Sequence, residues 1–194
     1  MKLSLLICLM LMLPGSVLAA TALNYYKYAH NNAEYSVMLP EVPRARTIWA
    51  EDGNVPYLDQ APARGAIGEV ATFRRVDVET EDSFDVRITY LQADSAFLAS
   101  LTKDKMLAAL EKGLQGPPLE NKKQGYSAGS NKALKWASIS GFSVDKSNRP
   151  FYNALHYLTG LESILVIQVR YSIENKVFAE YYHRLASSII YQPL

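Results

Sequence analysis

Cysteine is almost absent from this sequence of 194 residues. The single cysteine, Cys8, lies in the apolar segment at the N-terminus. The rest of the chain therefore contains no disulfide, no thiol nucleophile and no thiolate metal ligand. A fold built from it depends on its hydrophobic core alone for stability in an oxidising compartment.

The sequence also lacks an apolar run long enough to cross a bilayer. The run Leu3–Leu13 is far shorter than the ~20 residues that a membrane span needs, which argues against a retained transmembrane anchor. A lysine precedes the run, Pro14 ends it, and the small residues Val17 and Ala19 follow at the positions that signal peptidase recognises. We expect residues 1–19 to be a cleavable signal peptide, and the mature protein to be periplasmic in a Gram-negative source and secreted otherwise.

Neither sign of charge is in excess. Lysine and arginine total 20 and aspartate and glutamate total 19, and Lys2 lies in the predicted leader, so the mature chain is formally neutral. Overall charge therefore does not suggest a polyanionic partner, and we predict no nucleic-acid binding. The remaining chain, about 175 residues, has the length of one ordinary domain, which we place at residues 20–194.

Motifs that carry chemistry are also missing. The histidines His30, His156 and His183 fall on a turn, a strand and the polar side of a helix, without the spacing of a metal site. Acidic residues between Asp77 and Asp85 leave two interpretations open, a calcium site or a solvated hairpin tip. The sequence has no G-x-S-x-G elbow and no glycine-rich phosphate loop. We predict no cofactor and no metal, and a non-enzymatic protein is favoured, although a pair of carboxylates leaves an enzyme open.

The strongest structural signal is a hairpin from Phe151–Leu158 to Ser163–Tyr171. In its second strand Leu165, Ile167 and Val169 point to one side, and the residues between them are largely apolar as well. A strand that is apolar on both faces lies at the centre of a sheet with helices above and below.

The other segments have weaker but ordered patterns. Alternation and turn residues predict strands, apolar periodicity predicts helices, and clusters of proline, glycine and charge predict irregular segments. The predicted strands are 22–30, 33–39, 66–77, 84–92 and 132–142, the helices are 102–114 and 173–189, and the irregular segments are 40–64 and 120–131. These elements predict an α+β protein in which helices flank a mainly antiparallel central sheet of about six or seven strands, an α/β/α sandwich of order β-β-β-β-α-β-β-β-α.

The irregular segment 40–64 is the predicted working surface, because loops held by a rigid scaffold carry function more often than the scaffold does. Arg44, Arg46, Trp49 and Asp52 are its candidate binding residues, since arginine and tryptophan are enriched at binding hot spots. For Trp49 a second interpretation stays open, in which the indole fills the end of the core.

Tyrosines gather in the first predicted hairpin. Tyr25 points to one face of its strand, and Tyr26 and Tyr28 point to the other. Either set is a candidate for recognition, since tyrosine is favoured at interfaces, and both can instead pack against the fold. We include Tyr25 among the candidate binding residues.

Two stretches of sequence resemble a known family. YYKYAHNNAEYSVMLPEVP is similar to the entry hairpin of the PsbP-like α/β/α sandwich group, and NRPFYNALHYLTGLESILVIQVRYSIE, followed by a helix closing on LASSII, is similar to its last strands and helix. The resemblance implies an accessory or interaction protein, as in the extrinsic subunits of photosynthetic complexes or bacterial envelope members such as DcrB, and it brings no shared catalytic residue. This chain lacks the lipidated cysteine of the bacterial lipoprotein members.

Two functions follow as hypotheses. In the first, the chain is a non-enzymatic extracytoplasmic accessory protein that binds another protein or assists an envelope complex. In the second, it is a small-molecule binder or hydrolase with a site between the segment 40–64 and the sheet.

Overall fold

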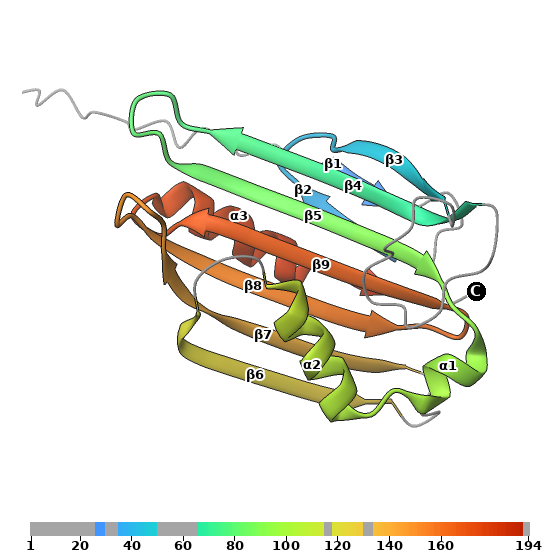
Figure 1. Ribbon diagram of the computed structural model, residues 1–194. Helices are drawn as coiled ribbons and strands as arrows, with labels where there is room; N and C mark the ends of the chain where they lie inside the picture. The colour runs from blue at the N-terminus through green and yellow to red at the C-terminus, as the bar shows by residue number, and fades with distance from the viewer. Residues whose placement is uncertain (1–25, 30–34, 50–65, 115–117, 130–133, 192–194) are drawn as a thin grey trace, which may run out of the picture.

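The computed structural model describes residues 26–29, 35–49, 66–114, 118–129 and 134–191. Its centre is a seven-stranded sheet of strand order β3-β4-β5-β9-β8-β7-β6, in which every neighbouring pair is antiparallel (Figure 1). The predicted α+β class with a mainly antiparallel central sheet is confirmed. The strands are β3 (Arg44–Trp49), β4 (Ala66–Val76), β5 (Ser83–Gln92), β6 (Glu120–Ala128), β7 (Lys135–Val144), β8 (Pro150–Thr159) and β9 (Ser163–Ser172).

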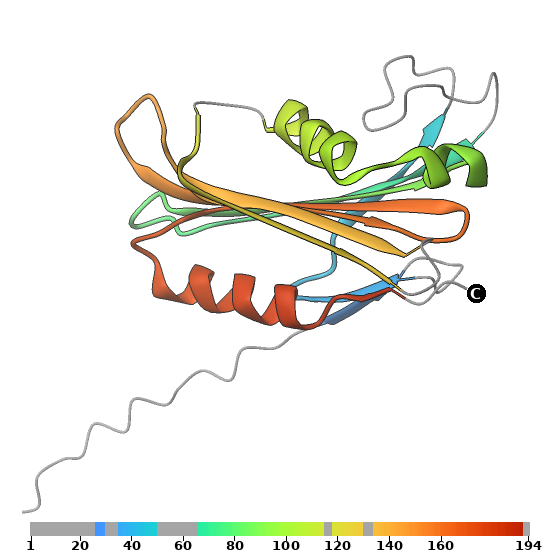
Figure 2. The same ribbon diagram turned by 90° about the horizontal axis from the view of Figure 1, so that it is seen from below.

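Layers cover both sides of this sheet (Figure 2). The helices α1 (Ser95–Ser100) and α2 (Lys103–Gly113) lie on one side, and α3 (Lys176–Ser187) lies on the other. The predicted first hairpin forms as β1 (Tyr26–Ala29) and β2 (Tyr35–Leu39), but it joins β10 (Ile190–Tyr191) in a separate three-stranded sheet on the α3 side. The arrangement is an α/β/α sandwich in which this small sheet completes the α3 layer.

Strand β9 is the centre of the core, as its sequence predicts. Leu165 and Ile167 pack in a cluster with Phe178 and Tyr181 of α3, whereas Val166 packs in a second cluster on the other side of the sheet, with α2. Each of these strand side chains is at most 1% exposed. Burial of both faces puts the largest apolar contribution to stability in this strand.

Both outer strands of the sheet differ from the sequence-based prediction. The segment 40–64 was expected to be irregular, but it contains β3, and the expected polar loop 120–131 contains β6. Of the side chains in β3, only Ile48 is buried, and in β6 none is fully buried. An outer strand pairs on one side only and needs little burial, so its sequence lacks the alternation that identifies inner strands.

The last helix begins later than predicted. The side-chain oxygen of Asn175 accepts hydrogen bonds from the backbone N–H groups of Val177 and Phe178, at 3.1 and 3.3 Å, and so caps the helix at Lys176. Ile173 therefore lies outside the helix and Val177 lies in its first turn, and both are exposed. The predicted start of this helix, at residue 173, was therefore three residues too early.

A buried lysine holds the end of α1. The Nζ of Lys135 donates hydrogen bonds to the carbonyl oxygens of Leu98, Ala99 and Leu101, at 2.9, 3.4 and 2.6 Å. Burial lowers the pKa of Lys135 from its ordinary value. The carbonyl oxygen of Leu98 also accepts a hydrogen bond from the backbone N–H of Leu101, at 3.3 Å. Because the last carbonyls of a helix lack further partners within the helix, the ammonium group supplies the donor that the end of α1 needs.

Candidate functional site

Among the described residues, helices cover only half of the sheet on the side of α1 and α2. Helix α2 packs on β7 and β8, while β3, β4 and β5 extend beyond it (Figure 1). Along these strands and β9, buried side chains give way to more exposed polar ones, at one level of the sheet in β4, β5 and β9 and one row earlier in β3. The change runs from Ile48 to Arg46 in β3, from Val70 to Thr72 in β4, from Thr89 to Arg87 in β5 and from Val166 to Gln168 in β9.

Five arginines gather on the open half, and we call this surface the arginine face. It consists of Arg44, Arg46, Arg74, Arg87 and Arg170, which come from β3, β4, β5 and β9. Strand register aligns them. One row across the sheet reads Arg44, Thr72, Arg87 and Gln168, and the next reads Arg74, Asp85 and Arg170.

Most of the positive charge on this face is not neutralised. Arg74 forms an ion pair with Asp85 at 3.2 Å, and Asp85 also accepts a hydrogen bond from the hydroxyl of Ser83 at 3.0 Å. Within the described part of the chain, no carboxylate lies within ion-pair distance of Arg44, Arg46, Arg87 or Arg170. A chain with almost no net charge therefore carries a locally basic surface.

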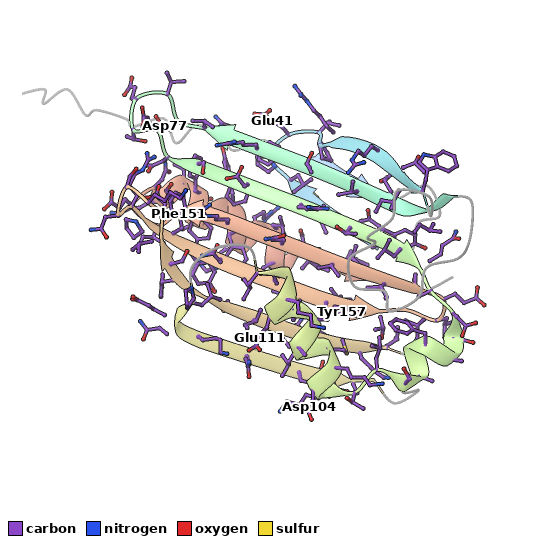
Figure 3. The ribbon with its side chains drawn as sticks, in the orientation of Figure 1. Glu41, Asp77, Asp104, Glu111, Phe151 and Tyr157 are labelled. Carbon is purple, nitrogen blue, oxygen red and sulfur yellow. The ribbon has the colours of Figure 1, made fainter. Side chains whose placement is uncertain are left out.

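Arg170 differs from the others because it is partly buried and held in place. Its guanidinium carbon lies 4.0 Å from the centre of the Phe151 ring, at the end of β8 that Figure 3 labels. Its Nε is buried and has no hydrogen-bond partner in the part of the chain that the structure describes. Stacking on a ring fixes the plane of a guanidinium and leaves its in-plane N–H groups available to a planar acceptor such as a carboxylate.

The predicted binding residues are partly assembled here. Arg44 and Arg46 lie on the arginine face, and Trp49, after a β-bulge at the end of β3, is 50% exposed. Asp52 and Tyr25 lie outside the described residues, and so does most of the segment 40–64 that the second functional hypothesis uses.

Arg74, Arg87 and Arg170 were not found from the sequence. A signal existed for Arg87, because the alternation in β5 places it on a polar side with Asp85. Arg74 and Arg170 join the site only through the register of β4, β5 and β9, which a single sequence does not show.

Two of the histidines can be located. His156 is 9% exposed, and its ring stacks with the rings of Trp136 and Tyr182 at centroid distances of 6.2 and 6.4 Å. Burial lowers its pKa to about 4, so the ring is neutral near pH 7. His183 is exposed on α3, and His30 lies outside the described residues. In the described ranges, no three histidine, aspartate or glutamate side chains gather as metal ligands.

The acidic segment after β4 forms a turn. A carboxylate oxygen of Asp77 accepts hydrogen bonds from the backbone N–H groups of Glu79 and Thr80, and the hydroxyl of Thr80 donates to Asp82 (Figure 3). These oxygens hold the backbone between β4 and β5, which supports the interpretation as a solvated hairpin tip.

Comparison with known proteins found similarity in structure but none in sequence. No family model matches the chain, and no curated protein matches it in sequence. Among solved structures, it is similar to the solution structure of cyanobacterial PsbP (CyanoP) from Synechocystis sp. PCC 6803, with a TM-score of 0.45, 10% identity, and coverage of 92% of this chain and 98% of that one. None of the helices in the described part is long and apolar enough to span a membrane.

Proposed function

We propose that this chain is an exported, non-enzymatic accessory protein that binds another protein through the arginine face. The observation that carries the proposal is a broad sheet surface on which four of the five arginines, all except Arg74, have no carboxylate within ion-pair distance among the described residues. Arginine is enriched at protein interfaces. An arginine that is already ordered, as Arg170 is by stacking on Phe151, loses less side-chain entropy when a partner binds.

The location outside the cytoplasm rests on residues 1–19, which have the composition of a signal peptide. The absence of cysteine from the mature chain suits an oxidising compartment, because no thiol is present to form a wrong disulfide. The mature protein then starts at Ala20.

The contact is tested by placing a photo-crosslinking amino acid at Thr72, which is exposed between Arg44 and Arg87 in its row. The matched control carries the same amino acid at Glu180, which is exposed on α3 on the opposite side of the sheet. Irradiation of cells should give one product of defined mass from Thr72 and none from Glu180. The partner is then identified by mass spectrometry, and the product is reproduced with the two purified proteins.

The same preparation gives the N-terminal sequence of the exported protein, which should begin at Ala20. If Thr72 yields no product in cells or with purified partner candidates, the face does not bind a protein and the proposed function is wrong. If Met1 is retained in the exported protein, the signal peptide is wrong while the contact can still stand.

A further inference from the structure

The arginine face also indicates the chemistry of its partner, and this step rests on the proposed function above. We propose that it binds an extended acidic segment of the partner, with aspartate or glutamate at alternate positions. Charge complementarity selects this occupant, since Asp85 is the acidic side chain in the rows of the face and it is already paired with Arg74.

The spacing of the arginines suits a row of carboxylates better than a single anion. Arg44 and Arg46 are two residues apart on β3, which separates them by roughly 6.6 to 6.8 Å along the strand. Alternate side chains of an extended peptide repeat at the same interval, so one carboxylate can face each arginine. Arg87 lies two strands away from Arg44, at roughly 10 Å, and extends the band across the sheet.

Position in the sheet supports the same occupant. Among the described strands, β3 is the outer strand at the arginine-face edge of the sheet, and its four residues Arg44–Thr47 are all exposed. An extended segment can pair with such an edge while its side chains alternate between the two faces of the sheet. On β4, the residues directly opposite Arg44 and Arg46 are the uncharged Thr72 and Val70. A segment added on the other side of β3 can place carboxylates directly opposite these arginines, and opposite charges across a strand pair are favourable.

The use of arginine, and not lysine, on this face also favours a carboxylate partner. Every cation of the face is an arginine, although the chain also has exposed lysines elsewhere, such as Lys112, Lys123 and Lys176. The guanidinium group presents parallel N–H donors that match both oxygens of a carboxylate, which an ammonium group does not. The interior of the face, at Thr72, Arg87 and Gln168, offers no large apolar side chain for insertion into a lipid surface.

The probe is a synthetic peptide of about ten residues that alternates glutamate and threonine, which in an extended form places all carboxylates on one side. Its controls alternate glutamine or lysine with threonine. Binding to the exported protein is measured by fluorescence anisotropy at low and high salt. The glutamate peptide should bind, and its affinity should fall as salt screens the charges.

The test variant is Arg44→Gln combined with Arg46→Gln and Arg87→Gln. The control variant removes the same charge elsewhere, by Lys112→Gln, Lys123→Gln and Lys176→Gln. The arginine variant should bind the glutamate peptide about tenfold more weakly or worse, because three charge pairs of about 0.5 kcal/mol each correspond to a factor of ten. The lysine variant should bind as the parent does. Arg75→Gln adds a single-site control, since Arg75 lies on the other face of β4 and pairs with Glu41.

Several results would overturn the inference. Equal loss of binding in both triple variants would mean that only net charge matters. Arginine-dependent binding to vesicles containing phosphatidylglycerol, without binding of the peptide, would assign the face to a membrane. Unchanged peptide binding together with self-association of the arginine variant would show that the arginines only protect the edge of β3. If the crosslink at Thr72 persists in the arginine variant, the acidic segment is wrong and the proposed protein contact stands.

Discussion

The buried histidine makes the stability of the fold depend on pH. His156 is enclosed by Trp136 and Tyr182, and its Nε2 lies 3.4 Å from the Tyr182 hydroxyl oxygen. Burial raises the pKa of Tyr182, so its hydroxyl remains protonated at neutral and acid pH. Burial also lowers the pKa of His156 to about 4, against roughly 6.5 in an unfolded chain.

The sign of the effect follows from which state binds the proton. Between the two pKa values the unfolded chain binds a proton at His156 and the folded protein does not, so acid favours unfolding. Full stability is present above about pH 6.5 and is lost as the pH falls toward 4. The shift corresponds to roughly 3 kcal/mol in total, and about 2 kcal/mol of it is lost between pH 7 and pH 5.

Urea unfolding at a series of pH values measures this loss. Carboxylates also titrate in acid, so the wild-type profile is compared with that of His156→Gln, which cannot take up a proton at this position. The free energy of unfolding of the wild type should fall more steeply than that of the variant, by about 2 kcal/mol from pH 7 to pH 5. His156→Phe serves as a second variant that retains a ring, and His183→Gln on α3 serves as a control. If the wild type and both His156 variants have parallel profiles, His156 is not buried in neutral form and the packing around it is wrong.

Two further predictions concern the core. Lys135→Met removes the side-chain donor to the carbonyl oxygen of Leu101 and one of the two donors to that of Leu98. The free energy of unfolding should therefore fall by about 2 to 4 kcal/mol in urea titration, whereas Lys112→Met, at an exposed position of α2, should change it by less than about 0.5 kcal/mol. A Lys135→Met protein as stable as its parent would contradict the capping role. Val166→Asp places a charge where the side chain is 1% exposed, at a cost of several kcal/mol against a total stability of roughly 5 to 15, so circular dichroism should show no cooperative melting, and a soluble variant with a sharp transition would contradict the position of β9.

The sequence predicts the centre of the fold better than its edges. In β9, apolar residues continue on both faces because both faces are buried, and this pattern has one structural meaning for a segment of strand length. In β3 and β6, most side chains are exposed to solvent. These strands form because their backbones pair with β4 and β7, respectively. Backbone pairing imposes no hydrophobic pattern on the side chains of an outer strand, so the sequence-based prediction assigned both strands to irregular segments.

Side-chain size is also a poor guide to which face of β7 is buried. Trp136 and Phe142 share one face, and Phe142 is 37% exposed, whereas the smaller Ala137 and Ile139 on the other face are fully buried under α2. The bulky face contacts Gly125 of β6, where an added Cβ would lie 2.8 Å from the Trp136 ring. The aromatic residues of β7 therefore pack on the α3 side of the sheet, where Phe142 contacts Tyr152 and Trp136 contacts His156.

The arginine face shows how a site can be present in a sequence and still be invisible. Along β9 the change from Val166 to Gln168 looks like the end of an apolar strand, and along β5 Arg87 looks like an ordinary solvated position. Register puts these changes at one level across adjacent strands, which is where the cover by α1 and α2 ends. A helix layer that stops halfway exposes the rest of the sheet to water, and polar residues are expected there. Solvent alone accepts either sign of charge, however, whereas the described residues of this surface include five arginines and one carboxylate, Asp85, which is already paired with Arg74. The selection of one sign, rather than the exposure itself, is what points to an acidic partner.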